Sequence, residues 1–291
     1  MTATLTAPRQ RSPLYFAWRR FAGNKAAVVA GIVLAVLILM AIFAPLITKT
    51  GPSDQSYLTQ ALAFPSREFW FGIDDLGRDF FTRIVYGARV SLTIGFTAAL
   101  FSVLIGIPLG AVAGYYGGRA DWVVMRLIEL FSVVPPLLAA MLLGALTQGG
   151  FFTIVLIAAL FGWVQVCLLV RAQVKAFKEK EFVRAAQALG ATPGYIIRRH
   201  LIPNSISPII VGFVLAIPLA MMLEASLSFL GIGVPPPTPS WGQMINTGMN
   251  FMYFYWHMAV YPTAALAITV LATTLFGDGL RDALDPTLKG R

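Results

Sequence analysis

The chain has 291 residues, of which 57% are hydrophobic and only 12% are charged, and its formal net charge is +9. A soluble domain carries roughly 25% charged residues, because its whole surface must be solvated. The low charge content excludes an ordinary soluble enzyme or binding domain. It predicts instead that much of the surface faces lipid.

Stretches without Asp, Glu, Lys or Arg occupy residues 26–48, 90–116, 130–170, 201–223 and 225–277. A membrane-spanning helix needs about 20 apolar residues, and these stretches lack the strict alternation of a barrel strand. Two of them are too long for one helix, so we divide them at Gly149-Gly150 and at the prolines between residues 235 and 239. We therefore predict an all-α integral membrane protein with six transmembrane helices, at 26–48, 89–116, 122–147, 151–171, 206–224 and 258–280.

Basic residues predict the orientation, because Lys and Arg collect in cytoplasmic connections. The arm 1–25, the segment 172–205 and the tail 281–291 are basic and fall on one side of a six-helix chain. We expect these segments, and both termini, in the cytoplasm. The nearly neutral loop 49–88 is expected outside, with an interfacial helix.

The remaining residues, 89–280, are expected to form a five-helix core. Within it, residues 225–257 mix apolar residues with glycines and prolines, which is typical of a re-entrant segment on the outer side. Since topology accounts for the positive net charge, we expect contacts with membrane lipid and no nucleic-acid partner.

The sequence lacks the common motifs of phosphate-binding, zinc-binding and nucleophilic catalytic sites. It has no Gly-rich phosphate loop, no His-Glu-x-x-His zinc motif and no Gly-x-Ser-x-Gly nucleophile motif. Two histidines and the single cysteine, Cys167, cannot supply four zinc ligands. We expect no catalytic residue, metal or cofactor in this chain.

One basic segment, EFVRAAQALGATPGYIIRRHLIPNS (residues 181–205), interrupts the apolar sequence. Its first part carries an apolar stripe at helical spacing, formed by Phe182, Ala185, Ala186 and Leu189. Gly190 stands where a helix end favours glycine. Thr192 and Pro193 then predict the start of a second helix, which we expect to end near Pro203.

A helix–Gly–helix bracket of this kind could lie on lipid headgroups, with its basic residues toward the phosphates. A helix lying on lipid favours bulky apolar side chains, however, whereas alanine and glycine allow another protein to approach closely. The small residues of the stripe therefore favour protein docking.

The bracket resembles the "EAA" loop of ATP-binding-cassette (ABC) importer permeases. Their pattern is Glu-Ala-Ala, three residues, Gly, nine residues and Ile-x-Leu-Pro. The chain departs from it at Arg184, where the family has glutamate, and also at His200 and Ile202. The resemblance implies that the bracket couples the membrane helices to an ATPase through Phe182, Ala185, Ala186, Leu189, Gly190 and Pro203.

Three further segments resemble the C-type permease subunit of dipeptide and oligopeptide importers: FGIDDLGRDFFTRIVYGARVSL (71–92), EASLSFLGIGVPPPTPSWG (224–242) and GDGLRDALDP (277–286). The resemblance covers about residues 14–286 and departs at Ile73, where threonine is usual. It implies the type I ABC importer permease fold in a bacterial inner membrane. It also implies three kinds of partner component: a B-type second permease, two ATPase domains that bind ATP and Mg²⁺, and an extracytoplasmic peptide-binding protein.

Nickel and glutathione importers share these signatures, so they remain alternatives for the substrate. A secondary transporter is a weaker alternative, because it would need internal repeats and intramembrane ion sites. A membrane scaffold without transport would not need the bracket.

Several single residues are candidates for a functional role. Glu129 is expected either to line the pathway or to pair with Arg126 one turn away. Glu224 and Phe229, before the proline-rich segment, are candidates for the pathway or an outer gate, and Glu224 also for a role facing the receptor. A glycine column with four-residue spacing allows close helix packing, either within this subunit or against the second permease: Gly106, Gly110 and Gly114.

Overall fold

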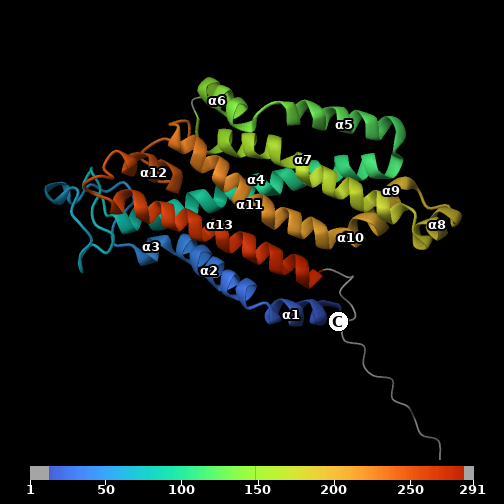
Figure 1. Ribbon diagram of the computed structural model, residues 1–291, viewed down its shortest axis with the longest axis horizontal. Helices are drawn as coiled ribbons and strands as arrows, with labels where there is room; N and C mark the ends of the chain where they lie inside the picture. The colour runs from blue at the N-terminus through green and yellow to red at the C-terminus, as the bar shows by residue number, and fades with distance from the viewer. Residues whose placement is uncertain (1–12, 148, 285–291) are drawn as a thin grey trace, which may run out of the picture.

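The computed structural model describes residues 13–147 and 149–284, and over these residues the chain is a bundle of helices with no named strand (Figure 1). Five helices are long and apolar enough to cross a membrane: α2 (Lys25–Ile42), α4 (Phe80–Tyr116), α7 (Phe151–Lys178), α11 (Ile206–Phe229) and α13 (His257–Leu284). The predicted all-α membrane fold is therefore confirmed.

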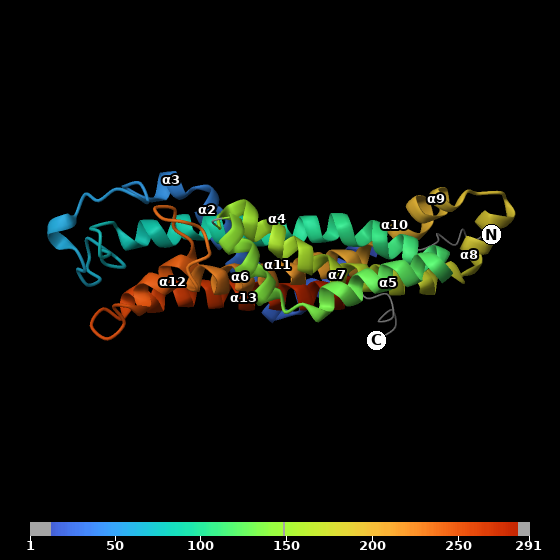
Figure 2. The same ribbon diagram turned by 90° about the horizontal axis from the view of Figure 1, so that it is seen from above.

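The long helices run roughly side by side in both views (Figures 1 and 2). Helix α4 packs mainly against α7 and α11, while α13 packs against α2, α12 and α11. The short helices α8 (Glu181–Ala188) and α9 (Pro193–Ile196) lie at one end of the bundle. Helix α12 (Trp241–Met249) and the loop after α3 (Ala44–Ile47) lie at the other.

The predicted single span 122–147 is wrong in its shape. The structure has two helices there, α5 (Gly118–Val133) and α6 (Pro136–Thr147), which meet at an angle of 79°. The break falls at Pro135 and Pro136. Proline has no backbone N–H, and its ring disfavours a helical conformation at the residue before it. The pair counts as a sixth span only if both helices are taken as one broken crossing.

The described part of the N-terminal arm forms a helix of its own. Helix α1 (Pro13–Gly23) precedes α2, which begins after Asn24, whose side chain accepts a hydrogen bond from the Ala27 N–H at 3.2 Å. The ring of Phe21 lies edge-on to that of Phe276 at 5.4 Å, so α1 rests against the end of α13.

The connection from Thr48 to Asp79 holds only one short helical turn, η1 (Leu58–Gln60), in place of the expected interfacial helix. The helix that follows, α4, starts well before the predicted residue 89. Asp79 caps it by accepting a hydrogen bond from the Thr82 N–H at 2.9 Å.

The glycine column lies where α4 meets α7. A Cβ added at Gly106 would stand 2.7 Å from the Cβ of Val166, and one added at Gly110 would stand 2.5 Å from the carbonyl oxygen of Cys167. One at Gly114 would stand 2.8 Å from the Arg171 carbonyl. Both backbones approach too closely here for any side chain, so the column packs within this subunit.

Candidate functional site

The helix–Gly–helix bracket forms as the sequence predicted. Helix α8 ends at Ala188, and Gly190 has a φ of +79°, a left-handed conformation that residues with a Cβ rarely adopt. Thr192 then caps α9 through its hydroxyl oxygen, which accepts a hydrogen bond from the Tyr195 N–H at 3.4 Å.

The second helix of the bracket ends near Pro203, as predicted, but it is not a uniform α-helix. After α9 the helix continues through a π-helical turn, η2 (Ile197–Leu201), into α10 (Ile202–Asn204). This helical segment ends at Asn204, directly after Pro203. Ser205 precedes α11, which begins at Ile206, the first residue of the predicted fifth span.

The inner face of the bracket is fixed to the long helices. Val183, Ile196 and Leu201 are fully buried. They belong to one apolar cluster with residues from α4, α7 and α11: Ala111, Tyr115, Val166, Val170, Val174 and Ile209. Since packed interiors resist deformation, a force on the bracket reaches three long helices.

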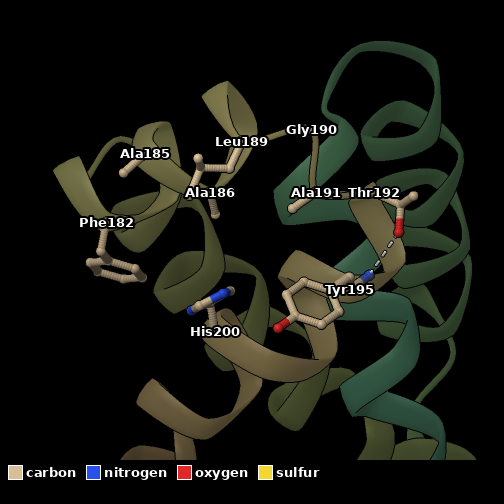
Figure 3. A pocket seen from close by; sticks show the side chains of 9 residues that line it. All are labelled: Phe182, Ala185, Ala186, Leu189, Gly190, Ala191, Thr192, Tyr195 and His200. Atoms are coloured by element: carbon tan, nitrogen blue, oxygen red, sulfur yellow. Dashed lines mark hydrogen bonds between the residues drawn. The ribbon is translucent and has the colours of Figure 1, made fainter.

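The outer face of the bracket is an open hollow (Figure 3). Leu189 is 89% exposed at its rim, and the rings of Phe182 and Tyr195 lie to either side of His200. Five of the six residues expected to couple to an ATPase line this hollow, and Pro203 lies outside it. The lining consists of Phe182, Ala185, Ala186, Leu189, Gly190, Ala191, Thr192, Tyr195 and His200.

Arg184, the departure from the "EAA" pattern, does not line the hollow. Its guanidinium lies 3.4 Å from the Glu179 carboxylate, and both side chains are about 70% exposed. An exposed pair of this kind contributes little to stability.

Glu129 forms an exposed ion pair with Arg126 one turn away on α5. The guanidinium of Arg126 also lies over the ring of Trp122, 5.5 Å from its centroid. Of the two alternatives for Glu129, the structure therefore shows the ion pair with Arg126.

Glu224 does not face the outside. Its side chain is fully buried where α4, α11 and α12 meet. The hydroxyls of Ser228 and Ser91 donate hydrogen bonds to its carboxylate at 2.7 and 3.2 Å, and the Ser91 oxygen accepts one from the Trp241 N–H at 3.3 Å. Glu224 therefore forms a polar contact between helices, and its role in an outer gate stays a prediction.

Phe229, the other candidate for an outer gate, lies at the end of α11 and is 46% exposed. Its carbonyl oxygen accepts a hydrogen bond from the side-chain amide of Asn246 on α12. This contact also joins α11 to α12.

A buried ionic cluster in the motif at residues 71–92 was not expected from the sequence. Asp74 and Arg83 are each 2% exposed, and the Asp74 carboxylate lies 2.6 Å from Arg78 Nε and 3.4 Å from Arg83 Nε. Arg83 also donates to the carbonyl oxygens of Pro52 at 3.0 Å and Pro237 at 3.4 Å. The cluster ties the first loop, α4 and the proline-rich segment together.

Asp75, beside this cluster, is half-buried. Burial raises the pKa of its carboxyl, and the neighbouring Asp74 charge raises it further. Asp74 and Arg78, an acidic and a basic residue four positions apart, were the signal that could have indicated the cluster.

A second ion pair joins α5 to α7. The Asp121 carboxylate on α5 accepts two hydrogen bonds from the Arg171 guanidinium on α7, one of them at 2.7 Å. A bidentate contact of this kind fixes the relative orientation of the two side chains as well as the distance between them. It holds the start of the broken helix pair against α7.

Comparison with known proteins places this architecture in a family. The family described as "Binding-protein-dependent transport system inner membrane component" matches residues 106–290, and the "N-terminal TM domain of oligopeptide transport permease C" matches residues 12–65. A solved chain of the MetNI methionine ABC transporter, in an inward facing conformation, aligns with a TM-score of 0.55 at 18% identity, covering 70% of this chain and 96% of that one. The fold is that of a type I ABC importer permease.

Curated relatives match nearly the whole chain. The oligopeptide transport system permease protein OppC of Bacillus subtilis (strain 168) is 42% identical over 93% of this chain and 88% of its own length. The dipeptide transport system permease protein DppC of the same strain is 43% identical over 94% and 85%. The glutathione transport system permease protein GsiD of Pectobacterium atrosepticum is 38% identical over 99% and 97%. The chain therefore belongs to the inner membrane component family of binding-protein-dependent transport systems.

Proposed function

We propose that this chain is one of two membrane-spanning subunits of an ATP-driven importer that moves oligopeptides or dipeptides into the cytoplasm. The similarity to the OppC and DppC permeases over most of the chain supports this substrate class. Similarity to a glutathione permease keeps glutathione as the alternative. Nickel stays an alternative as well.

The observation that carries the proposal is the two-faced bracket. Its outer face is a hollow lined by small and apolar residues, and its inner face is continuous with the core of α4, α7 and α11. An ATPase domain seated in the hollow would push on the bracket when it closes on ATP. The buried inner face would pass this movement to the long helices as a rigid body.

The proposed coupling also assigns a role to each of the other components of the transporter. ATP and Mg²⁺ bind to the two ATPase domains, so this chain carries no catalytic residue and no cofactor. A B-type second permease forms the other half of the pathway. A peptide-binding protein delivers substrate at the end that holds α12, and both termini and the bracket face the cytoplasm.

The substrate is tested by reconstituting the complete transporter in vesicles with its binding protein and offering it dipeptides, longer peptides, glutathione and nickel ions. We expect ATP-dependent uptake of peptides and none of nickel. Uptake of glutathione alone would replace the peptide assignment by the alternative. ATP turnover by this subunit in isolation would contradict the division of labour.

A further inference from the structure

The turn between α12 and α13, residues 250–256, displays a group of large apolar side chains. Tyr253 is 97% exposed, Phe254 80%, Trp256 49% and Met252 47%. The turn has no charged residue. In Figure 2 it projects beyond the ends of the two helices that it joins.

This turn is held in shape from within. The N–H groups of Phe254 and Tyr255 both donate to the carbonyl oxygen of Phe251, at 3.2 and 2.8 Å. Phe251 and Tyr255 are only half-buried, yet both pack against the apolar cluster around Trp241, and the Tyr255 ring lies 5.5 Å from that of Phe64. Two aromatic residues therefore anchor the turn while its other large side chains point outward.

The position of the turn along the bundle follows from α2 and α13, which pack against each other in opposite directions (Figure 1). Ala41 and Met258 share one core cluster near one end. Near the other end, a Cβ added at Gly279 would stand 2.1 Å from the Cβ of Ala27. The two helices therefore cover the same levels of the bundle.

Charged residues lie at both ends of the region over which α2 and α13 pack together. Lys25 begins α2, and Asp278 is the first charged residue of α13. At the opposite limit Arg89 donates hydrogen bonds to the carbonyl oxygens of Ala41 and Ile42, each at 2.9 Å. The Arg89 guanidinium therefore stands at the level of Met258, from which α13 continues without a charged residue to Gly277.

The length of that part matches a membrane. From Met258 to Gly277 the helix is about 30 Å long at a rise of about 1.5 Å per residue, which is the thickness of the hydrocarbon core. The turn 250–256 lies directly outside this stretch, at the end where α13 begins. Its level is the layer of lipid headgroups, where Trp and Tyr are enriched because they combine an apolar ring with a polar tip.

We propose that residues 250–256 form a lipid-binding anchor, with Tyr253, Phe254 and Trp256 inserted at the boundary between headgroups and acyl chains. The anchor fixes the depth of α13 and, through the short connection, of α12. A protein partner on this turn is the competing possibility, and the absence of charge together with the level along the bundle favours lipid.

The test uses the full chain with Met252→Cys, which keeps all the aromatic residues. The variant is labelled with a fluorophore and reconstituted in phosphatidylcholine–phosphatidylglycerol vesicles. Cys167 is fully buried and does not compete for the label. Ser53→Cys, in the exposed first loop, is the matched control. Nitroxides at the headgroup or deep in the acyl chain report lipid contact, and iodide reports exposure to water.

We expect the headgroup nitroxide to remove most of the fluorescence at position 252, the deep nitroxide to remove little, and iodide to act mainly on position 53. Adding Tyr253→Asp and Phe254→Asp should exchange lipid quenching for iodide quenching. Iodide quenching at position 252 equal to that at position 53 would overturn the proposal. Protection from all three quenchers would also overturn it, because the turn would then face neither lipid nor water.

Discussion

Glu224 shows how a single buried side chain can tie several helices together. Its carboxylate accepts hydrogen bonds from Ser228 on its own helix and from Ser91 on α4, and Ser91 in turn accepts from the N–H of Trp241 at the start of α12. The side chain of Trp241 is fully buried as well, and its indole N–H donates to the Ile84 carbonyl oxygen at 3.0 Å. These contacts make α12 part of the bundle.

Removing this carboxylate should loosen α12. Glu224→Ala leaves the two serine hydroxyls without their acceptor, and an unsatisfied buried polar group costs about 1–3 kcal/mol of unfolding free energy. Glu224→Gln keeps one acceptor oxygen and should lose less. Thermal unfolding in detergent measures the difference. Glu129→Ala, at an exposed position, is the control. A Glu224→Ala chain as stable as the unmodified one would contradict the assigned role.

At the scale of elements, the glycine column sets the distance between α4 and α7. Any side chain at Gly110 meets backbone, because a Cβ there would stand 2.5 Å from the Cys167 carbonyl and 2.9 Å from the Val170 Cβ. Backbone cannot rotate away as the end of a flexible side chain can. The two helices must therefore separate to accept a larger residue.

Gly110→Val should for this reason lower the unfolding free energy by about 1–3 kcal/mol, the usual cost of overpacking. Gly194→Ala is the matched control, since nothing lies within 4 Å of a Cβ at that position. Circular dichroism on heating compares the two variants. Equal midpoints would show that α4 and α7 are not held together through this column.

The sequence predicted the long helices well, because hydropathy reports the part of each helix that contacts lipid. It missed their extensions, such as the first turns of α4. There Arg83 is buried and satisfied by Asp74 and the Pro52 carbonyl, and hydropathy cannot detect polar groups that are paired. The bend between α5 and α6 did have a signal, the Pro135-Pro136 pair, but the apolar run around it favoured one straight span.

The bracket could be predicted in detail because local rules decide it: helical spacing of the apolar stripe, a glycine at a positive φ and a capping threonine. The surroundings of Glu224 could not be predicted. They depend on Ser91 and Trp241, which are far from it in sequence and approach it only through the packing of α4 and α12. Contacts of this kind leave no periodic pattern.

At the scale of the whole molecule, the bracket and α12 lie at opposite ends of the bundle (Figure 1). The proposed orientation therefore places the first loop outside and the bracket in the cytoplasm. Ser53→Cys and Gly194→Cys, both at exposed positions, should react with an impermeant maleimide from opposite sides of oriented vesicles. Reaction of both from the same side would rule out this topology.

The central claim is that the hollow on the bracket seats an ATPase domain, and the most direct test compares two substitutions on the same helix. Ala186 lines the hollow, whereas Ala188 is exposed and does not line it. Ala186→Trp should block docking by its bulk, and Ala188→Trp should be tolerated. Both chains should still insert, because the bracket lies outside the charge-free stretches of the long helices.

The measurement is the amount of ATPase that co-purifies with each variant from the assembled transporter, together with peptide uptake in vesicles. We expect Ala186→Trp to lose both the bound ATPase and the uptake, while Ala188→Trp and Arg198→Ala keep them. If Ala186→Trp retains the ATPase and full uptake, the bracket is not the docking element and the account of coupling is contradicted.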